Sequence, residues 1–246
     1  SWTAPPAAGE WTDIGAAVHP ADGAGESVLV GRITQGDADA ELEVEGEVIL
    51  GTGNAITDGT NGLAAGSNNT VSGGDAAAIG QGGTASGAGS IVIGDGSEAT
   101  ATNTMALGRN ASVTIQAEVA MGCPTDGTTG DYQTRFFRLR GSTTNATLTE
   151  LATPVRLTMD NNSVWVFEIQ VAAVSQGSTQ SAGYKFEGTI ARYGSAATTT
   201  LVGSVVKTVY GEDDAAWDVT VDADTTFGAL RVQVQGNTGD NVDWLA

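Results

Sequence analysis

The residues of this chain that could bind a metal ion or catalyse a reaction are acidic side chains that lie close together in the sequence. Carboxylate pairs offer oxygen ligands to Ca²⁺, and two carboxylates that face each other are also what a glycosidase uses. Loops of so acidic a chain hold such pairs by chance, and we therefore assign no metal, no cofactor and no catalytic residue. The candidate groups are Asp222 with Asp224, Glu212-Asp213-Asp214, and Asp240 with Asp243.

The first 48 residues hold ten acids against one base, Arg32. Within them, Glu41-Leu42-Glu43-Val44-Glu45-Gly46-Glu47-Val48 alternates acidic and apolar residues, which places four carboxylates on one face of a strand. That face is either a solvated strand surface or a site for a cation or a basic partner. Trp2 and Trp11 are candidate anchors for attachment to another protein.

The chain has one cysteine, Cys123, and one histidine, His19. An intrachain disulfide is therefore excluded, and a single histidine argues against a His-centred triad or a zinc cluster. Cys123 follows the last glycine of a repeat described below. It is either a small buried residue that closes this part of the fold, or a thiol that is reactive or bridges two chains.

A loop rich in hydroxyl and amide groups, Ser175 to Ser181, is the best candidate for contact with a glycan or a receptor. Flexible polar loops on a rigid scaffold are a common place for binding residues. Aromatic residues at strand positions are instead expected in the core: Trp165, Phe167, Phe186 and Trp217. The candidate binding residues are Gln176, Ser178, Thr179, Gln180 and Tyr184.

The elements that position this loop are antiparallel strands. Between Val164 and Ala173, apolar residues alternate with others and fall on one face, and Tyr184, Phe186 and Ile190 repeat this pattern. Further strands are expected at 201–210, 217–222, 230–235 and 241–246, with Gly, Asp, Asn and Ser in the turns. The spacing predicts an antiparallel β-sandwich over residues 131–246.

The preceding stretch is a repeat array. The phrase Ala-Ile-Gly at Gly80 recurs with small changes, and the glycines that close it are spaced by 14 residues four times running: Gly66, Gly80, Gly94, Gly108 and Gly122. A unit of this length suits two strands of about five residues with tight turns, so each unit predicts one coil of a β-roll. We expect each glycine to follow its strand in a turn that needs positive φ. Because each coil buries few apolar side chains, we also expect lateral association.

The repeats resemble the head repeats of trimeric autotransporter adhesins, as in Ser90-Ile91-Val92-Ile93-Gly94-Asp95-Gly96 and Ala106-Leu107-Gly108-Arg109-Asn110. A similar roll occurs in bacteriophage fibre proteins. The resemblance implies a left-handed parallel roll and three chains side by side. The phrases from Trp217-Asp218-Val219 to Val242-Asp243-Trp244 resemble C-terminal domains of phage tail fibres. A long heptad stalk and a membrane-anchor barrel, which adhesins have, are missing from this sequence, and this favours the virus fibre.

The composition of the chain excludes some classes of binding partner. The formal net charge of −19 repels nucleic acid and anionic lipid surfaces. The sequence has no run of 18 apolar residues, so no insertion into a membrane is expected. An enzymatic spike needs a long groove walled by a large β-helix, and five short coils do not offer one.

The sequence therefore predicts an all-β chain: a trimeric left-handed parallel β-roll followed by an antiparallel β-sandwich. We divide it into an acidic attachment segment (1–48), the roll (49–124), a linker (125–130) and the sandwich (131–246). The predicted function is that of a non-enzymatic homotrimeric bacteriophage fibre on the virion surface. It would bind other virion proteins of the tail or capsid and a glycan or protein of the host surface. The alternatives are a head fragment of a bacterial trimeric surface adhesin and a capsular polysaccharide depolymerase.

Overall fold

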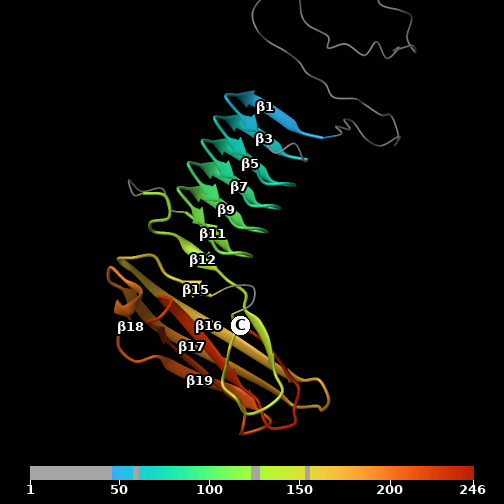
Figure 1. The fold of residues 1–246 in the computed structure, drawn as a ribbon, viewed down its shortest axis with the longest axis vertical. Helices are drawn as coiled ribbons and strands as arrows, with labels where there is room; N and C mark the ends of the chain where they lie inside the picture. The colour runs from blue at the N-terminus through green and yellow to red at the C-terminus, as the bar shows by residue number, and fades with distance from the viewer. Residues whose placement is uncertain (1–45, 58–60, 123–127, 153–155) are drawn as a thin grey trace, which may run out of the picture.

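A computed structural model describes residues 46–57, 61–122, 128–152 and 156–246. In this part of the chain a parallel β-roll lies above an antiparallel β-sandwich (Figure 1). Apart from one short 3-10 helix, Ala196–Thr198, the regular elements described are strands. The structure thus confirms the predicted fold class as an all-β chain with a parallel β-roll followed by an antiparallel β-sandwich. Residues 41–45 of the predicted acidic strand lie outside the described residues, as do Trp2, Trp11, His19 and Cys123.

Each coil of the roll consists of one long and one short strand, and equivalent strands of successive coils pair in parallel. The short strands have two residues rather than the predicted five, because left-handed residues such as Gly96 and Asn110 stand shortly before them and leave little room. The long strands are β1 (Val48–Thr52), β3 (Leu63–Ser67), β5 (Ala77–Gln81), β7 (Ile91–Asp95), β9 (Met105–Arg109) and β11 (Val119–Met121). The short strands are β2 (Ala55–Ile56), β4 (Thr70–Val71), β6 (Thr84–Ala85), β8 (Glu98–Ala99) and β10 (Ser112–Val113).

The interior of the roll is narrow and is filled by small side chains. The second residue of a long strand and the second residue of a short strand point inward, as the alternation of a strand requires. From β3 onward these residues are fully buried: Ala64, Ala78, Val92, Ala106 and Ala120 from the long strands, and Val71, Ala85, Ala99 and Val113 from the short ones. A core this thin depends on stacking of coils, since one coil buries very little by itself.

Four of the five repeat glycines lie inside the long strands, at the fourth position and not in the turn that follows, whereas Gly122 comes directly after β11. Gly66, Gly80, Gly94 and Gly108 have positive φ and lie beside one another in the sheet. A Cβ on Gly94 would lie 1.7 Å from the carbonyl oxygen of Gly108, so the stacking distance itself requires glycine. Gly122 differs: its φ is not positive, and a Cβ there would lie 2.1 Å from the carbonyl oxygen of Arg109.

A buried amide holds one corner of the roll. Asn69 is 1 % exposed, and its Nδ2 donates to the carbonyl oxygens of Ala65 and Gly80 at 2.9 and 3.0 Å. Its Oδ1 accepts from the backbone N–H of Gly83 at 2.9 Å. This side chain therefore joins the backbones of two successive coils.

Replacing Asn69 by leucine is expected to lower the free energy of unfolding by about 2–3 kcal/mol, since several buried backbone groups lose their partners. Urea unfolding followed by circular dichroism measures this. Gln81→Leu on the exposed surface of the next coil is the control and should change stability by less than about 0.5 kcal/mol. Equal effects of the two changes would contradict the assigned role of the amide.

The first and third residues of the long strands point away from the interior and form what we call the outer roll face. The third residues form one row across the sheet: Leu50, Ala65, Ile79, Ile93, Leu107 and Met121. The first residues form a second row: Val48, Leu63, Ala77, Ile91, Met105 and Val119. All twelve are apolar, and Leu50, Ile93 and Met121 are 58, 43 and 49 % exposed.

One further strand, β12 (Thr134–Phe136), closes the roll and was not foreseen. It pairs antiparallel with β11, so Phe136 continues the second row of the outer roll face and Arg135 points inward. There Arg135 Nε donates to the carboxylate of Glu118, which is fully buried. The second oxygen of Glu118 accepts from the N–H of Ile115 at 3.2 Å. A buried ion pair therefore forms the end of the roll.

The sandwich has two sheets. The larger sheet contains β13 (Arg140–Thr143), β22 (Val242–Leu245), β16 (Ser163–Ser175), β17 (Ser181–Arg192), β18 (Thr199–Leu201) and β19 (Val206–Glu212). The smaller contains β14 (Thr149–Glu150), β15 (Leu157–Thr158), β20 (Asp218–Asp224) and β21 (Ala229–Gln235). The single strand expected over 201–210 is two strands, β18 and β19, which pair with different parts of β17.

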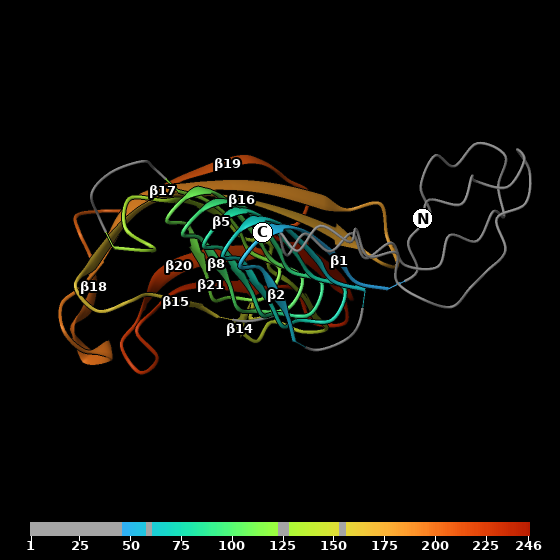
Figure 2. The ribbon, with the colours of Figure 1, turned by 90° about the horizontal axis from the view of Figure 1, so that it is seen from above.

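The core of the sandwich is aromatic, unlike that of the roll. Trp217 and Trp244 have ring centroids 5.8 Å apart, and Trp244 Nε1 donates to Thr143 Oγ1 at 2.9 Å. Seen from above, the long strands of the roll lie on the same side as β16, β17 and β19, and the short strands lie on the side of β20 and β21 (Figure 2). The outer roll face and the outer face of the larger sheet are therefore presented on one side of the protein.

Candidate functional site

The loop that the sequence singles out lies at the end of the sandwich away from the roll (Figure 1). Gln176, Ser178 and Thr179 are exposed there, and Gln180 is half-buried. Gln176 Nε2 donates to Asp243 Oδ2 at 2.7 Å, and Ser178 Oγ donates to Gln180 Oε1 at 3.0 Å. With residues 239–241 the loop borders a shallow recess of about 310 Å³. The structure thus brings the four loop residues together as a polar surface.

Tyr184 does not belong to this surface. Its side chain is fully buried in the core between the two sheets, because it lies on the inner face of β17, and it cannot touch a receptor. Its hydroxyl donates to Glu212 Oε2 at 2.6 Å. Burial, followed by the hydrogen bond to Glu212, raises the pKa of Tyr184.

This pKa shift predicts a loss of stability in alkali. The folded protein holds the tyrosine proton more tightly than the unfolded chain does, so the contribution is complete below the ordinary pKa of 10.0 and is lost as the pH rises above it. We expect the free energy of unfolding to fall by up to about 1.4 kcal/mol per pH unit there. Urea unfolding between pH 9 and pH 11 should show a shallower fall for Tyr184→Phe, and equal slopes would contradict this assignment.

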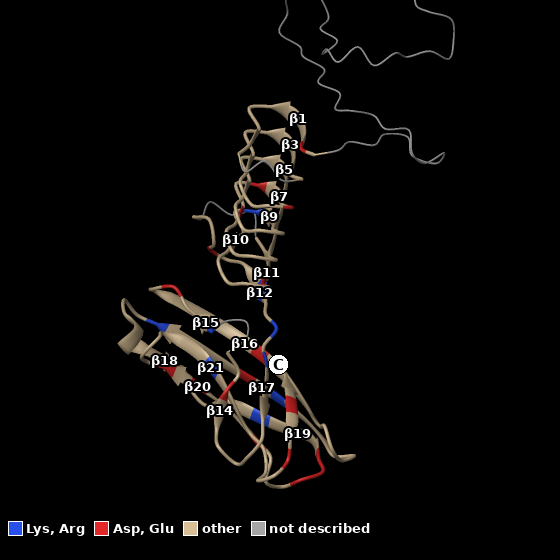
Figure 3. Cartoon of the chain, turned by 45° about the vertical axis from the view of Figure 1, so that its right-hand side comes forward, with Lys and Arg blue, Asp and Glu red and all other residues tan. Residues whose placement is uncertain are grey.

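Acidic side chains gather at the same end of the sandwich (Figure 3), where they hold loops together. Asp213 Oδ2 accepts from the N–H of Ser181 at 2.8 Å, and Asp214 Oδ2 accepts from Asn237 Nδ2 at 3.0 Å. The described residues contain no group of three or more His, Cys, Asp or Glu placed to hold a metal ion. Four of the carboxylates considered as calcium ligands here, those of Glu212, Asp213, Asp214 and Asp243, have protein partners.

Asp222 and Asp224, the remaining acidic pair, also have partners. Asp222 accepts two hydrogen bonds from Arg231, at 2.7 and 2.8 Å, and these raise the pKa of the arginine. Asp224 is 5 % exposed and accepts from the N–H groups of Thr226 and Phe227 at 2.8 and 3.1 Å. Asp222 therefore links strands β20 and β21, and Asp224 fixes the turn between them.

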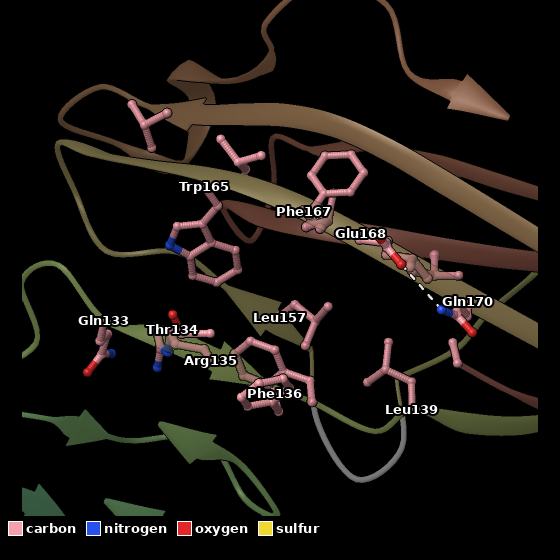
Figure 4. Close-up of a pocket in the computed structure, with 17 residues that line it drawn as sticks. Gln133, Thr134, Arg135, Phe136, Leu139, Leu157, Trp165, Phe167, Glu168 and Gln170 are labelled. Atoms are coloured by element: carbon pink, nitrogen blue, oxygen red, sulfur yellow. Dashed lines mark hydrogen bonds between the residues drawn. The ribbon is translucent and has the colours of Figure 1, made fainter. Parts of the chain in front are cut away.

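A groove that the sequence analysis missed lies between the roll and the sandwich. It has a volume of about 740 Å³ and is lined by residues 133–137, by β16 from Val164 to Gln170, and by the sandwich core at Leu157 and Leu230. Trp165 points from β16 toward the segment that carries Phe136 and Leu139, whereas the ring of Phe167 points away from that segment (Figure 4) and lies against Gly188 of β17. The groove is therefore largely apolar.

Arg135 organises one wall of this groove. Its guanidinium carbon lies 5.4 Å from the ring centroids of both Phe137 and Trp165, while its Nε binds Glu118 in the roll. The rings of Phe137 and Trp165 stack with centroids 6.0 Å apart and an angle of 25°. One arginine thus contacts both the roll and the sandwich. A usable signal was the run Arg135-Phe136-Phe137, where a cation and two rings stand shortly after the linker that follows the repeats.

Among the residues that line the groove, Glu168 supplies the single carboxylate. Hydrogen bonds from Gln170 and then from Lys185 lower its pKa. A glycosidase acid needs a raised pKa and a second carboxylate opposite it. The groove therefore fits apolar contacts better than hydrolysis.

No helix among the described residues has the length and hydropathy needed to span a membrane. No protein-family model matches the chain, and no curated protein matches it.

A search of solved structures finds similarity to the crystal structure of the tailspike protein of Acinetobacter phage vB_ApiP_P1. The two share 9 % sequence identity, and the match covers 81 % of this chain and 47 % of the tailspike, with a TM-score of 0.22. The chain thus spans about half the length of that protein. A likeness this low carries no argument about its site.

Proposed function

We propose that the chain is a subunit of a homotrimeric bacteriophage fibre whose rolls associate through the outer roll face and whose sandwich tip binds the host surface. The observation that carries this proposal is the outer roll face itself. It presents two apolar rows along the whole described roll, and Leu50, Ile79, Ile93 and Met121 on it are 38–58 % exposed. Contiguous apolar patches of this kind mark interaction surfaces in soluble proteins.

The number of copies and the viral setting rest on the resemblance of the repeat phrases to trimeric adhesin heads and phage fibres. In this proposal the fibre stands on the virion surface, attached through the N-terminal segment that contains Trp2 and Trp11. The chain then acts by binding and not by catalysis. Three tips on one fibre would compensate for weak single sites, because linked sites bind with a high effective concentration.

At the tip, the proposed receptor contacts are Gln176, Ser178, Thr179 and Gln180, whose hydroxyl and amide groups suit a glycan. Their position supports this role, since their loop lies at the end of the sandwich opposite the roll (Figure 1), and Gln176 and Ser178 border a recess. Gln176→Ala combined with Thr179→Ala should reduce adsorption of the fibre to host cells. Unchanged adsorption would remove these residues from the proposal, and shortening of capsular polysaccharide by the purified fibre would favour a depolymerase instead.

The proposed association of three chains is tested by measuring the native mass of the protein by light scattering coupled to size-exclusion chromatography. For a chain of 24.7 kDa we expect about 74 kDa, three times that mass. Ile93→Lys places a charge in the middle of the outer roll face and should give a monomer, whereas Gln81→Lys, on an exposed side chain of the same sheet, should not. A wild-type monomer would contradict the proposed fibre.

A further inference from the structure

The outer roll face is too small to hold copies together by itself. The six long strands of the roll, about 4.8 Å apart and up to about 16 Å long, cover on the order of 450 Å². In a ring of three, each copy divides this face between two neighbours. A specific interface of standard size buries about 800 Å² on each partner. Stable association therefore needs further contact area beyond the roll.

The apolar surface continues from the roll into the groove. Phe136 extends the second row of the outer roll face by one strand, is 56 % exposed, and also lines the groove. Beyond it Val164 and Val166, on β16, are 59 and 85 % exposed and line the groove as well. Because the outer roll face and this sheet lie on one side (Figure 2), a copy packed on the roll extends toward these valines.

One edge of the groove is an unpaired strand. β17 pairs with β16 along its whole length, but β22 covers the opposite edge only from Ala172 to Ser175. In the described part of the chain no strand pairs with the edge from Ser163 to Val171. Leu139 and Ala246 exchange backbone hydrogen bonds of 2.8 and 2.9 Å at the end of this gap. Backbone groups along nine residues thus remain available beside an apolar groove, an arrangement that accepts added chain.

We infer that the groove between β12 and the free edge of β16 is occupied by a second copy of this chain, so that the contact between copies continues from the roll into the sandwich. This inference rests on the proposed association of copies. It assigns Phe136, Val164 and Val166 to the interface and supplies the area that the roll lacks. The backbone edge of β16 then gains hydrogen-bond partners only in the assembled protein.

Photo-crosslinking in the purified full chain tests this inference. A photoreactive phenylalanine analogue is placed singly at position 93 on the outer roll face, at 166 beside the groove, and at 148 in the loop between β13 and β14, where Leu148 is 43 % exposed. We expect covalent multimers from positions 93 and 166 and none from 148. Multimers from 93 without any from 166 would overturn the inference and leave the proposed association standing.

Other outcomes are equally decisive. A native mass of one chain, with no multimers from either position, would overturn the association and the inference together. Crosslinking at 166 that appears only when host envelope is added would assign the groove to a receptor and overturn the inference. As a second measurement, Val166→Asp should raise the chain concentration at which the assembly dissociates by about tenfold or more, as loss of a well-packed contact does, whereas Leu148→Asp should not.

Discussion

A Glu118→Leu variant is expected to lose about 3–5 kcal/mol of the free energy of unfolding. The change leaves Arg135, whose side chain is 11 % exposed, with no counterion inside the end of the roll. It also removes the acceptor for the N–H of Ile115. A buried charge without a partner is far more costly than a buried pair, so the loss should exceed that of any surface change in the roll.

A double-mutant cycle separates the charge from the packing. Glu118→Leu combined with Arg135→Leu should be more stable than either single variant, because apolar residues of similar size often replace a buried pair at little cost. Asp95→Asn is the surface control: Asp95 faces Arg109 at 3.1 Å with both side chains about half exposed, and its loss should cost at most about 1 kcal/mol. Urea unfolding at one fixed chain concentration measures all of these variants, and additive effects of the two leucines would contradict the pairing.

A Gly94→Ala variant should be destabilised by about 3 kcal/mol or more. Alanine at positive φ costs roughly 1–2 kcal/mol, and Gly94 has a φ of 145°. The larger part comes from the next coil, since the new Cβ would lie 1.7 Å from the carbonyl oxygen of Gly108. Backbone on both sides cannot yield without breaking hydrogen bonds between coils.

Gly82→Ala is the matched control for this prediction. Gly82 also has a positive φ, 63°, but a Cβ there would meet its nearest atom at 4.0 Å. This variant should therefore show the conformational cost alone, about 1 kcal/mol. The same urea unfolding experiment compares the two, and an equal loss for both would show that stacking distance does not require Gly94.

The parts of the fold that were predictable are those with a period in the sequence. The spacing of 14 residues between glycines matches the register of the parallel sheet, in which Gly66, Gly80, Gly94 and Gly108 lie side by side. Apolar alternation in β16 likewise placed Val171 and Ala173 in the core. In both cases one repeated physical requirement, close stacking or burial of one face, is visible along the chain itself.

The parts that were missed depend on contacts between distant residues. In the sequence, nothing distinguishes Arg135 from other arginines that follow a linker. Its role arises because β12 pairs antiparallel with β11 and so places Arg135 beside Glu118. Its position after a polar loop predicts that Tyr184 is a binding residue, but its place on the inner face of β17 puts it in the core. The groove has no sequence signal as a whole, because it arises where β22 stops short of covering β16.

The 14-residue register of the roll also sets how its length could change during evolution. Each coil presents the same backbone edge above and below, so a duplicated unit such as residues 77–90 would pair with the coils on either side in the existing register. Every duplication would move the sandwich away from β1 by about one strand spacing, 4.8 Å, and leave Glu118 and Arg135 together at the end. The distance between the two ends of this protein is thus adjustable only in whole steps, and by recombination more readily than by point substitution.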